Sequence, residues 1–159
     1  MTTLPITLTI AGASAVLNFW IGERVGMLRR RLKILIGDGG NEAVVARMRA
    51  HSNFIEYTPL FLILLALVEL SRGSPAWLWV VAVLFVIGRI IHAFGMDRPG
   101  ANALRIGGMV LTFLPTLVLA AYGFAIPYLD RNRPQTITYV EADAAASTRS
   151  ATNGFVLRS

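Results

Sequence analysis

The chain has 159 residues, of which 55% are hydrophobic and only 15% are charged, whereas soluble domains carry roughly 25% charged residues. Its net charge is +6, but the basic residues gather at the ends of apolar segments, so a lipid bilayer is the expected partner and nucleic acid is not. Because the sequence has no cysteine and its two histidines, His51 and His92, lie far apart, disulfides and cysteine nucleophiles are excluded and no metal site is expected.

The first apolar segment covers residues 4–28. It is long and begins without a basic side chain, unlike a signal peptide, which has a charged start and a short apolar run. We therefore expect a retained membrane helix, in which Asn18 can hydrogen-bond to a neighbouring helix. The connection after it is basic and contains Arg29, Arg30, Arg31 and Lys33.

The second helix is expected over residues 42–70. The glycine-rich turn before it ends in Asn41, a residue type suited to the N-cap. Pro59 lies inside the segment, where a membrane helix tolerates it with a kink or loosened hydrogen bonding. Glu69, near the far end of the helix, is expected to reach the lipid headgroups.

Two further helices are expected over residues 75–96 and 102–129. Every one of the four segments is long enough for a bilayer, whose hydrocarbon core needs about 20 apolar residues. The sequence thus predicts an all-α fold, a four-helix membrane domain over residues 1–130. Residues 131–159 are rich in Ala, Ser and Thr and lack a long apolar run, which predicts a flexible tail.

Positive charge predicts the orientation in the membrane. The connection between the first two helices is rich in arginine, the connection between the last two carries Arg98 and Arg105, and the middle connection has only Arg72. Because basic loops stay in the cytoplasm, we expect the Arg-rich loops there and both termini on the other side. The protein would lie in the inner membrane if it is bacterial.

The second helix carries a polar stripe made of Arg49, Asn53 and Glu56. Their spacing of four and then three residues places them on one helix face. A guanidinium, an amide and a carboxylate together can hold a zwitterion, and ionisable groups inside a membrane usually mark function. The alternative is a network that only locks helices together.

Other ionisable groups lie near the same membrane face. Arg89 and His92 are three residues apart on the third helix, where His92 can donate a hydrogen bond or act as a base. Arg105 begins the fourth helix, and its charge can favour a thiolate over a thiol. The alternatives are that Arg89 snorkels to the membrane surface, that His92 only bonds to a neighbouring helix, and that Arg105 only anchors the topology.

A family resemblance enters at residues 49–59, which read RAHSNFIEYTP. The order of Arg-Ala, Asn, Glu-Tyr and Pro at this spacing resembles the signature of the MAPEG family, the membrane-associated proteins in eicosanoid and glutathione metabolism. The resemblance covers roughly residues 4–129 and points to a bacterial-type relative of microsomal glutathione transferases. It implies a homotrimer that binds glutathione as co-substrate between protomers at the cytoplasmic side.

The resemblance also implies roles for individual residues. Arg105 would be catalytic, because it lies near the arginine that stabilises the glutathione thiolate in some members. The residues expected to contact glutathione are Arg49, His51, Asn53, Glu56, Tyr57, His92 and either Arg29 or Arg30.

The chain departs from eicosanoid-type members where they carry tyrosines, since His92 and Met96 stand at those places. A general glutathione transferase or peroxidase that acts on small lipophilic electrophiles from the lipid is therefore the expected function. One alternative is a non-enzymatic binding or scaffold protein of the same fold. Another alternative is a small transporter. The position of Glu56 argues against it, because a proton-coupling carboxylate is usually isolated near the centre of a span, whereas Glu56 lies beside polar neighbours and away from the centre.

Overall fold

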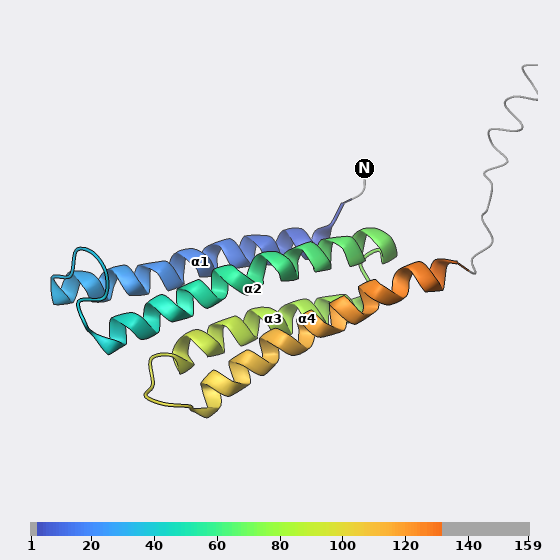
Figure 1. Ribbon diagram of the computed structural model, residues 1–159. Coiled ribbons are helices and arrows are strands. Elements are labelled where there is room, and N and C mark those ends of the chain that lie inside the picture. Colours follow the sequence, from blue (N-terminus) through green and yellow to red (C-terminus); the bar gives the residue numbers. More distant parts are fainter. Residues whose placement is uncertain (1–2, 132–159) are drawn as a thin grey trace, which may run out of the picture. The chain divides into compact units, whose positions relative to one another are not determined.

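The computed structural model describes residues 3–131, which form four α-helices (Figure 1). The predicted flexible tail lies outside these described residues, except for Arg131. The chain divides into two compact units, residues 1–127 and 128–159, and the following description concerns the first unit. The helices are α1 (Pro5–Leu32), α2 (Glu42–Arg72), α3 (Ala76–Gly95) and α4 (Ala103–Asp130).

Local sequence explains where the first two helices begin and end. Pro5 occupies the first turn of α1, where a missing N–H costs nothing. The helix ends at Leu32 rather than near residue 28, because Lys33 adopts a left-handed conformation (φ 58°) that caps it. Asn41 is the predicted N-cap of α2, and its Oδ1 accepts hydrogen bonds from two backbone N–H groups of the first turn at 3.1 and 3.2 Å.

The four helices are each long and apolar enough to cross a membrane. Their most apolar stretches have mean hydropathies of 1.4, 1.8, 2.1 and 2.0 in chain order. The shortest of the four helices has 20 residues, which matches the length of about 20 residues that a bilayer requires. The prediction of an all-α, four-helix membrane fold is confirmed over the described residues. The chain is a multi-pass integral membrane protein.

One half of the first unit contains an apolar core shared by all four helices. The rings of Phe61 on α2 and Phe85 on α3 stack with their centroids 3.8 Å apart. Aliphatic side chains surround this pair and are buried to the same degree. The core residues around the two rings are Ile6, Ile10, Leu65, Val68, Leu78, Ala82 and Leu119.

Glu69 closes this half of the unit and is only 2% exposed. Its carboxylate accepts hydrogen bonds from the backbone N–H groups of Ile6 (2.9 Å) and Thr7 (2.8 Å), which are unpaired donors of the first turn of α1. The hydroxyl groups of Thr7 (2.7 Å) and Ser74 (2.6 Å) donate to it as well. The prediction that Glu69 reaches the headgroups is wrong, because the helix start of α1 needs an acceptor and Glu69 supplies it.

Helices α3 and α4 approach each other closely at glycines. A methyl group on Gly108 would lie 2.5 Å from the backbone nitrogen of His92, and one on Gly88 would lie 2.7 Å from the Cβ of Leu111. Small residues let membrane helices pack backbone to backbone. These glycines fix the distance between α3 and α4 in the half of the unit opposite Glu69.

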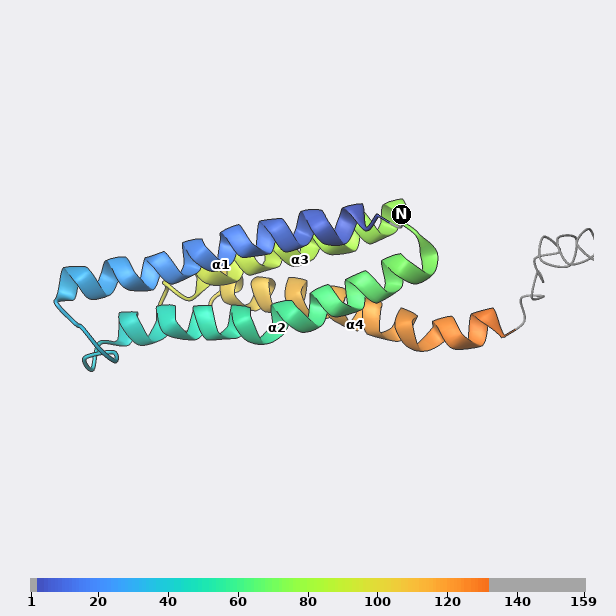
Figure 2. The same ribbon diagram turned by 90° about the horizontal axis from the view of Figure 1, so that it is seen from above.

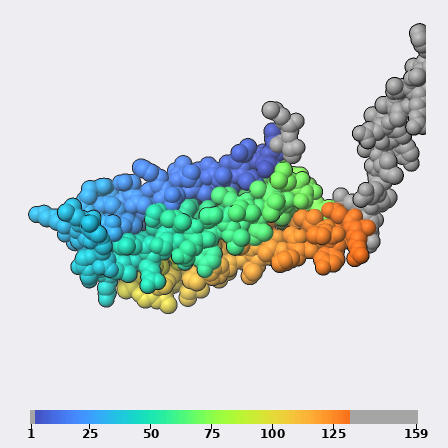
Figure 3. All heavy atoms as spheres, turned by 45° about the horizontal axis from the view of Figure 1, so that its top comes forward, coloured from blue at the N-terminus to red at the C-terminus, as the bar shows by residue number. Residues whose placement is uncertain are grey.

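The end of α1, the start of α2 and the loop between α3 and α4 lie at the same end of the unit, which we call the Arg-rich end (Figure 1). Seen from above, α1 runs beside α3 (Figure 2). In the space-filling view the surfaces of α1 in blue and α2 in green run side by side, and the yellow start of α4 lies toward the Arg-rich end (Figure 3). The fold therefore gathers the basic connections on one side of the membrane.

Candidate functional site

The polar stripe of α2 faces a cavity at the Arg-rich end. Arg49, Asn53 and Glu56 line this first cavity, which has a volume of about 310 Å³ and is completed by the loop residue Asp38 and by Ser52. The structure thus brings the guanidinium, the amide and the carboxylate of the predicted stripe to one opening. Arg49 and Glu56 are exposed on the surface of the single chain.

Two further cavities lie at the Arg-rich end. Arg49 also lines a second cavity of about 420 Å³, together with Met96 at the end of α3 and Arg105 on α4. Arg105 lines a third cavity as well, of about 460 Å³, with Arg47 and Arg98. The predicted binding stripe and the predicted catalytic residue therefore both line the second cavity through Arg49 and Arg105.

Arg105 lies at the start of α4, where its backbone N–H donates to the Oδ1 of Asn102 at 3.0 Å. Asn102 thereby caps the helix, and its own amide donates to the carbonyl of Gly95 at 2.9 Å. The exposed side chain of Arg105 adds its charge to the positive end of the helix dipole. An anion in the second or third cavity would meet the charge of Arg105, which lines both.

A clamp of Arg24, Arg47 and Asp97 joins α1, α2 and the α3–α4 loop at the third cavity, which Arg47 and Asp97 line. Arg24 on α1 is 7% exposed and forms a salt bridge with Asp97 of the α3–α4 loop. Its guanidinium also donates to the carbonyl of Ala93 at 3.1 Å and lies 4.8 Å from the ring of Trp20. Arg47 on α2 binds the other oxygen of Asp97 at 3.0 Å.

Sequence reasoning missed this clamp. The basic residues of the first connection predict only topology, and nothing in the sequence pairs Arg24 or Arg47 with Asp97. The available signal was a lone acid in a basic loop, because a carboxylate among arginines finds a guanidinium partner wherever the fold brings one close.

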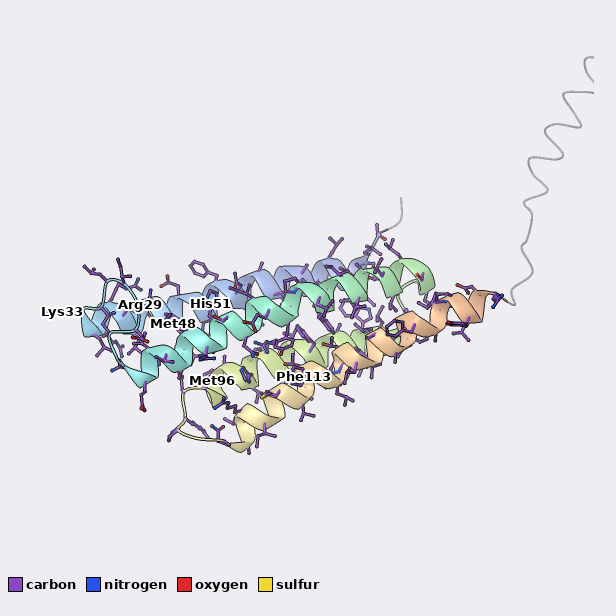
Figure 4. The ribbon with its side chains drawn as sticks, viewed as in Figure 1. Arg29, Lys33, Met48, His51, Met96 and Phe113 are labelled. Atoms are coloured by element: carbon purple, nitrogen blue, oxygen red, sulfur yellow. The ribbon has the colours of Figure 1, made fainter. Side chains whose placement is uncertain are left out.

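Several predicted contact residues lie away from the three cavities. His51 faces α1, where its Nε2 lies 3.0 Å from the Oδ1 of Asn18, and the prediction that Asn18 bonds to a neighbouring helix is confirmed. Arg30 pairs with Glu23 of its own helix at 3.0 Å. Arg29 donates to the sulfur of Met48 at 3.5 Å, near the α1–α2 loop (Figure 4). None of these three side chains lines a cavity described above.

Tyr57 and His92 are also turned away from the cavities within one chain. The ring of Tyr57 packs edge-on against Phe113 of α4, with the centroids 5.1 Å apart. His92 is 3% exposed and packs against the backbone of Gly108. By contrast Met96, at the other place where eicosanoid-type members carry tyrosine, lines both the second and the third cavity.

Arg89 is a second feature that the sequence did not reveal in full. It lies in the interior, and its Nη1 donates to the Oδ1 of Asn53 at 3.0 Å and to the hydroxyl of Thr112 at 3.4 Å. It therefore reaches the candidate site only through Asn53. The spacing of Arg89 and His92 indicated a polar position on α3 but did not indicate its partners.

Comparison with known proteins places the chain in a family. The model of the MAPEG family matches residues 7–125. The chain belongs to the MAPEG family. Two curated MAPEG relatives, both named Inner membrane protein YecN, come from Escherichia coli K12 and Escherichia coli O6:H1. Each is 28% identical over 86 residues, which is 54% of this chain and 65% of the relative, so the chain spans about two thirds of their length.

Proposed function

We propose that this chain is a membrane-bound glutathione transferase or peroxidase that acts on lipophilic electrophiles. The observation that carries the proposal is that Arg49, Asn53 and Glu56 line one cavity while Arg49 and Arg105 line the next. Membership in a family associated with glutathione metabolism supports it.

Three side chains of the first cavity offer groups that match those of glutathione. The tripeptide carries two carboxylates, one ammonium group and a thiol. Arg49 offers a planar fork for a carboxylate, Glu56 offers an anion for the ammonium, and Asn53 offers an amide for the peptide backbone. This division of roles uses every polar side chain of the stripe.

Arg105 would act on the sulfur. A guanidinium beside the thiol favours the thiolate, which is the nucleophile. In a transfer reaction the thiolate forms a carbon–sulfur bond while the leaving group departs with its electron pair, and the thiol proton goes to water. In a peroxidase reaction the thiolate attacks a hydroperoxide oxygen, so the oxygen–oxygen bond breaks, the alkoxide leaves as an alcohol after taking a proton, and a sulfenic acid forms. The thiol of a second glutathione then displaces water from the sulfenic acid and closes the disulfide. The apolar co-substrate would arrive from the lipid.

A homotrimer is part of the proposal. The cavities open to the surface of a single chain, and Arg49 and Glu56 are exposed there. A neighbouring protomer could cover the cavities and supply the further contacts to glutathione. Within one chain, the predicted contact residues Arg29 or Arg30, His51, Tyr57 and His92 do not line these cavities. Light scattering of the detergent-purified protein, corrected for detergent, tests the trimer.

Calorimetric titration of the purified protein with glutathione tests the function. Saturable binding that Arg49→Ala loses is expected, because the carboxylate would lose its charged partner. Arg31→Ala is the matched control, since Arg31 is an equally exposed arginine outside the cavities. Conjugation of an aryl halide such as chlorodinitrobenzene, abolished in Arg105→Ala, would establish the transferase. Absence of glutathione binding to a folded, monodisperse protein would overturn the proposal.

One observation favours a second candidate, a binding or scaffold protein of the same fold. His92 is buried against α4, which leaves the cavities without an acid–base side chain at that place. Glutathione binding without turnover of any electrophile or hydroperoxide would support this candidate.

A further inference from the structure

The side chain of Arg89 is a buried cation that its surroundings satisfy only in part. It is 1% exposed, lies 5.5 Å from the ring of Phe54, and bonds to Asn53 on α2 and Thr112 on α4. Within residues 3–131 its Nε and one Nη have no hydrogen-bond partner, and none of the ion pairs involves it. The guanidinium is therefore fixed by two neutral acceptors rather than by an anion.

Thr112 can only act as an acceptor toward Arg89. Its hydroxyl group donates its own hydrogen to the carbonyl of Gly108 at 2.8 Å, so its lone pairs face the guanidinium. This bond joins Arg89 to the backbone of α4 at Gly108, one of the places where α4 approaches α3 closely. The position of Arg89 is thus set by the packing of two helices.

The orientation of the Asn53 amide follows from this arrangement. A guanidinium has donors and no acceptor, so the atom of Asn53 that faces Arg89 at 3.0 Å has to be the carbonyl oxygen Oδ1. The NH₂ group then points away from Arg89. Because Asn53 also lines the first cavity, the group that it can offer there is a donor.

We infer that Arg89 is a positioning residue that determines which part of a ligand Asn53 recognises. By holding Oδ1, it makes the NH₂ of Asn53 the group presented to the first cavity, so the ligand atom that meets Asn53 is an acceptor oxygen of a peptide carbonyl or a carboxylate. The inference rests on the proposed function, and it assigns the ammonium group of glutathione to Glu56 and not to Asn53.

Asn53→Asp separates this role from a merely structural one. The substitution keeps the shape of the side chain, gives Arg89 the anion that it lacks, and replaces the donors in the cavity by an acceptor. We expect an equal or higher unfolding temperature together with a glutathione Kd raised about tenfold or more, because a donor is lost and two acceptors face each other. A higher unfolding temperature with unchanged affinity would overturn the inference.

Variants at Arg89 form the second arm. Arg89→Lys keeps a donor toward Oδ1 and should retain most of the affinity, whereas Arg89→Met frees the amide to rotate and should raise the Kd by about threefold to tenfold. A folded Arg89→Met protein that binds glutathione like the wild type would contradict the inference. If Arg89→Met does not fold, Asn53→Asp decides.

A spectroscopic readout separates failure of the inference from failure of the proposed function. If the wild type binds no glutathione, the proposed function fails, and the amide of Asn53 is then observed directly by NMR, assigned by its absence in Asn53→Asp. Its NH₂ signals should broaden with a water-soluble paramagnetic chelate and shift in Arg89→Lys. Signals that neither treatment affects would overturn the inference.

Discussion

The two ends of the bundle are held together by different means. At the Glu69 end, an apolar core shared by four helices lies beneath one carboxylate whose acceptor capacity is used by the start of α1. At the Arg-rich end the buried apolar cluster is smaller. The elements there are joined by close glycine contacts and by the Arg24–Asp97–Arg47 clamp, and three cavities remain open. The difference indicates that the Glu69 end stabilises the bundle, whereas the Arg-rich end keeps charged side chains available to a ligand.

The largest effect is expected from Gly108→Ala. The added methyl group would collide with the backbone of His92, which cannot move without displacing α3, so we expect a loss of about 3 kcal/mol of stability and of glutathione binding. Thermal unfolding and calorimetry measure both losses. Gly107→Ala is the matched control, because its methyl group would meet nothing within 4 Å. Equal stability of the two variants would show that glycine contacts do not hold the Arg-rich end.

Glu69→Gln tests the opposite end. The substitution removes the charge and places an NH₂ group against N–H donors, so we expect stability to fall by about 2 kcal/mol. Glutathione affinity should stay within about twofold of the wild type if the ends are independent. Glu23→Gln, which weakens an exposed pair with Arg30, should cost less than about 1 kcal/mol. A large loss of affinity in Glu69→Gln would contradict the separation of the two ends.

Asp97→Asn weakens the clamp with a smaller effect. The carboxylate is partly exposed and serves two arginines, of which Arg24 is buried, so a loss of about 1 to 2 kcal/mol is expected. Unfolding temperatures measured in low and high salt should converge between the variant and the wild type, because salt screens the pair. A stability difference that stays constant with salt would show that the clamp stabilises the protein through packing and hydrogen-bond geometry rather than through the attraction of its charges.

Arg31→Ala should have the smallest effect. Arg31 is exposed in the last turn of α1, where its charge interacts with the helix dipole by a few tenths of a kcal/mol. Unfolding temperature and glutathione affinity should both remain close to those of the wild type. A marked drop in affinity would extend the candidate site beyond the three cavities.

The fold was predictable because the hydropathy and charge of each local segment determine whether that segment spans the membrane. Four apolar segments long enough for a bilayer, separated by basic or Gly- and Pro-containing connections, determine four helices, and Asn41 marks the start of α2. Helix periodicity also placed Arg49, Asn53 and Glu56 on one face, and the structure brings them to one cavity.

The partners across helices were not predictable in the same way. Periodicity states which residues share a face but not which helix that face meets, so the sequence left open that His51 faces Asn18 on α1. Glu69 finds its donors at Ile6 and Thr7, more than sixty residues earlier. Such contacts depend on the order in which the helices pack, and single-helix patterns carry no information about it.

Arg89 has a further consequence for how the chain enters the bilayer. An arginine inside a transmembrane segment costs up to about 2.5 to 3.5 kcal/mol during insertion by the translocon, and α3 offsets this cost with the most apolar stretch of the four helices, of mean hydropathy 2.1. Synthesis delivers Asn53 before Arg89 and Thr112 after it. Helix α2 is therefore already synthesised when α3 enters the bilayer, and the guanidinium can make both of its hydrogen bonds only after α4 follows.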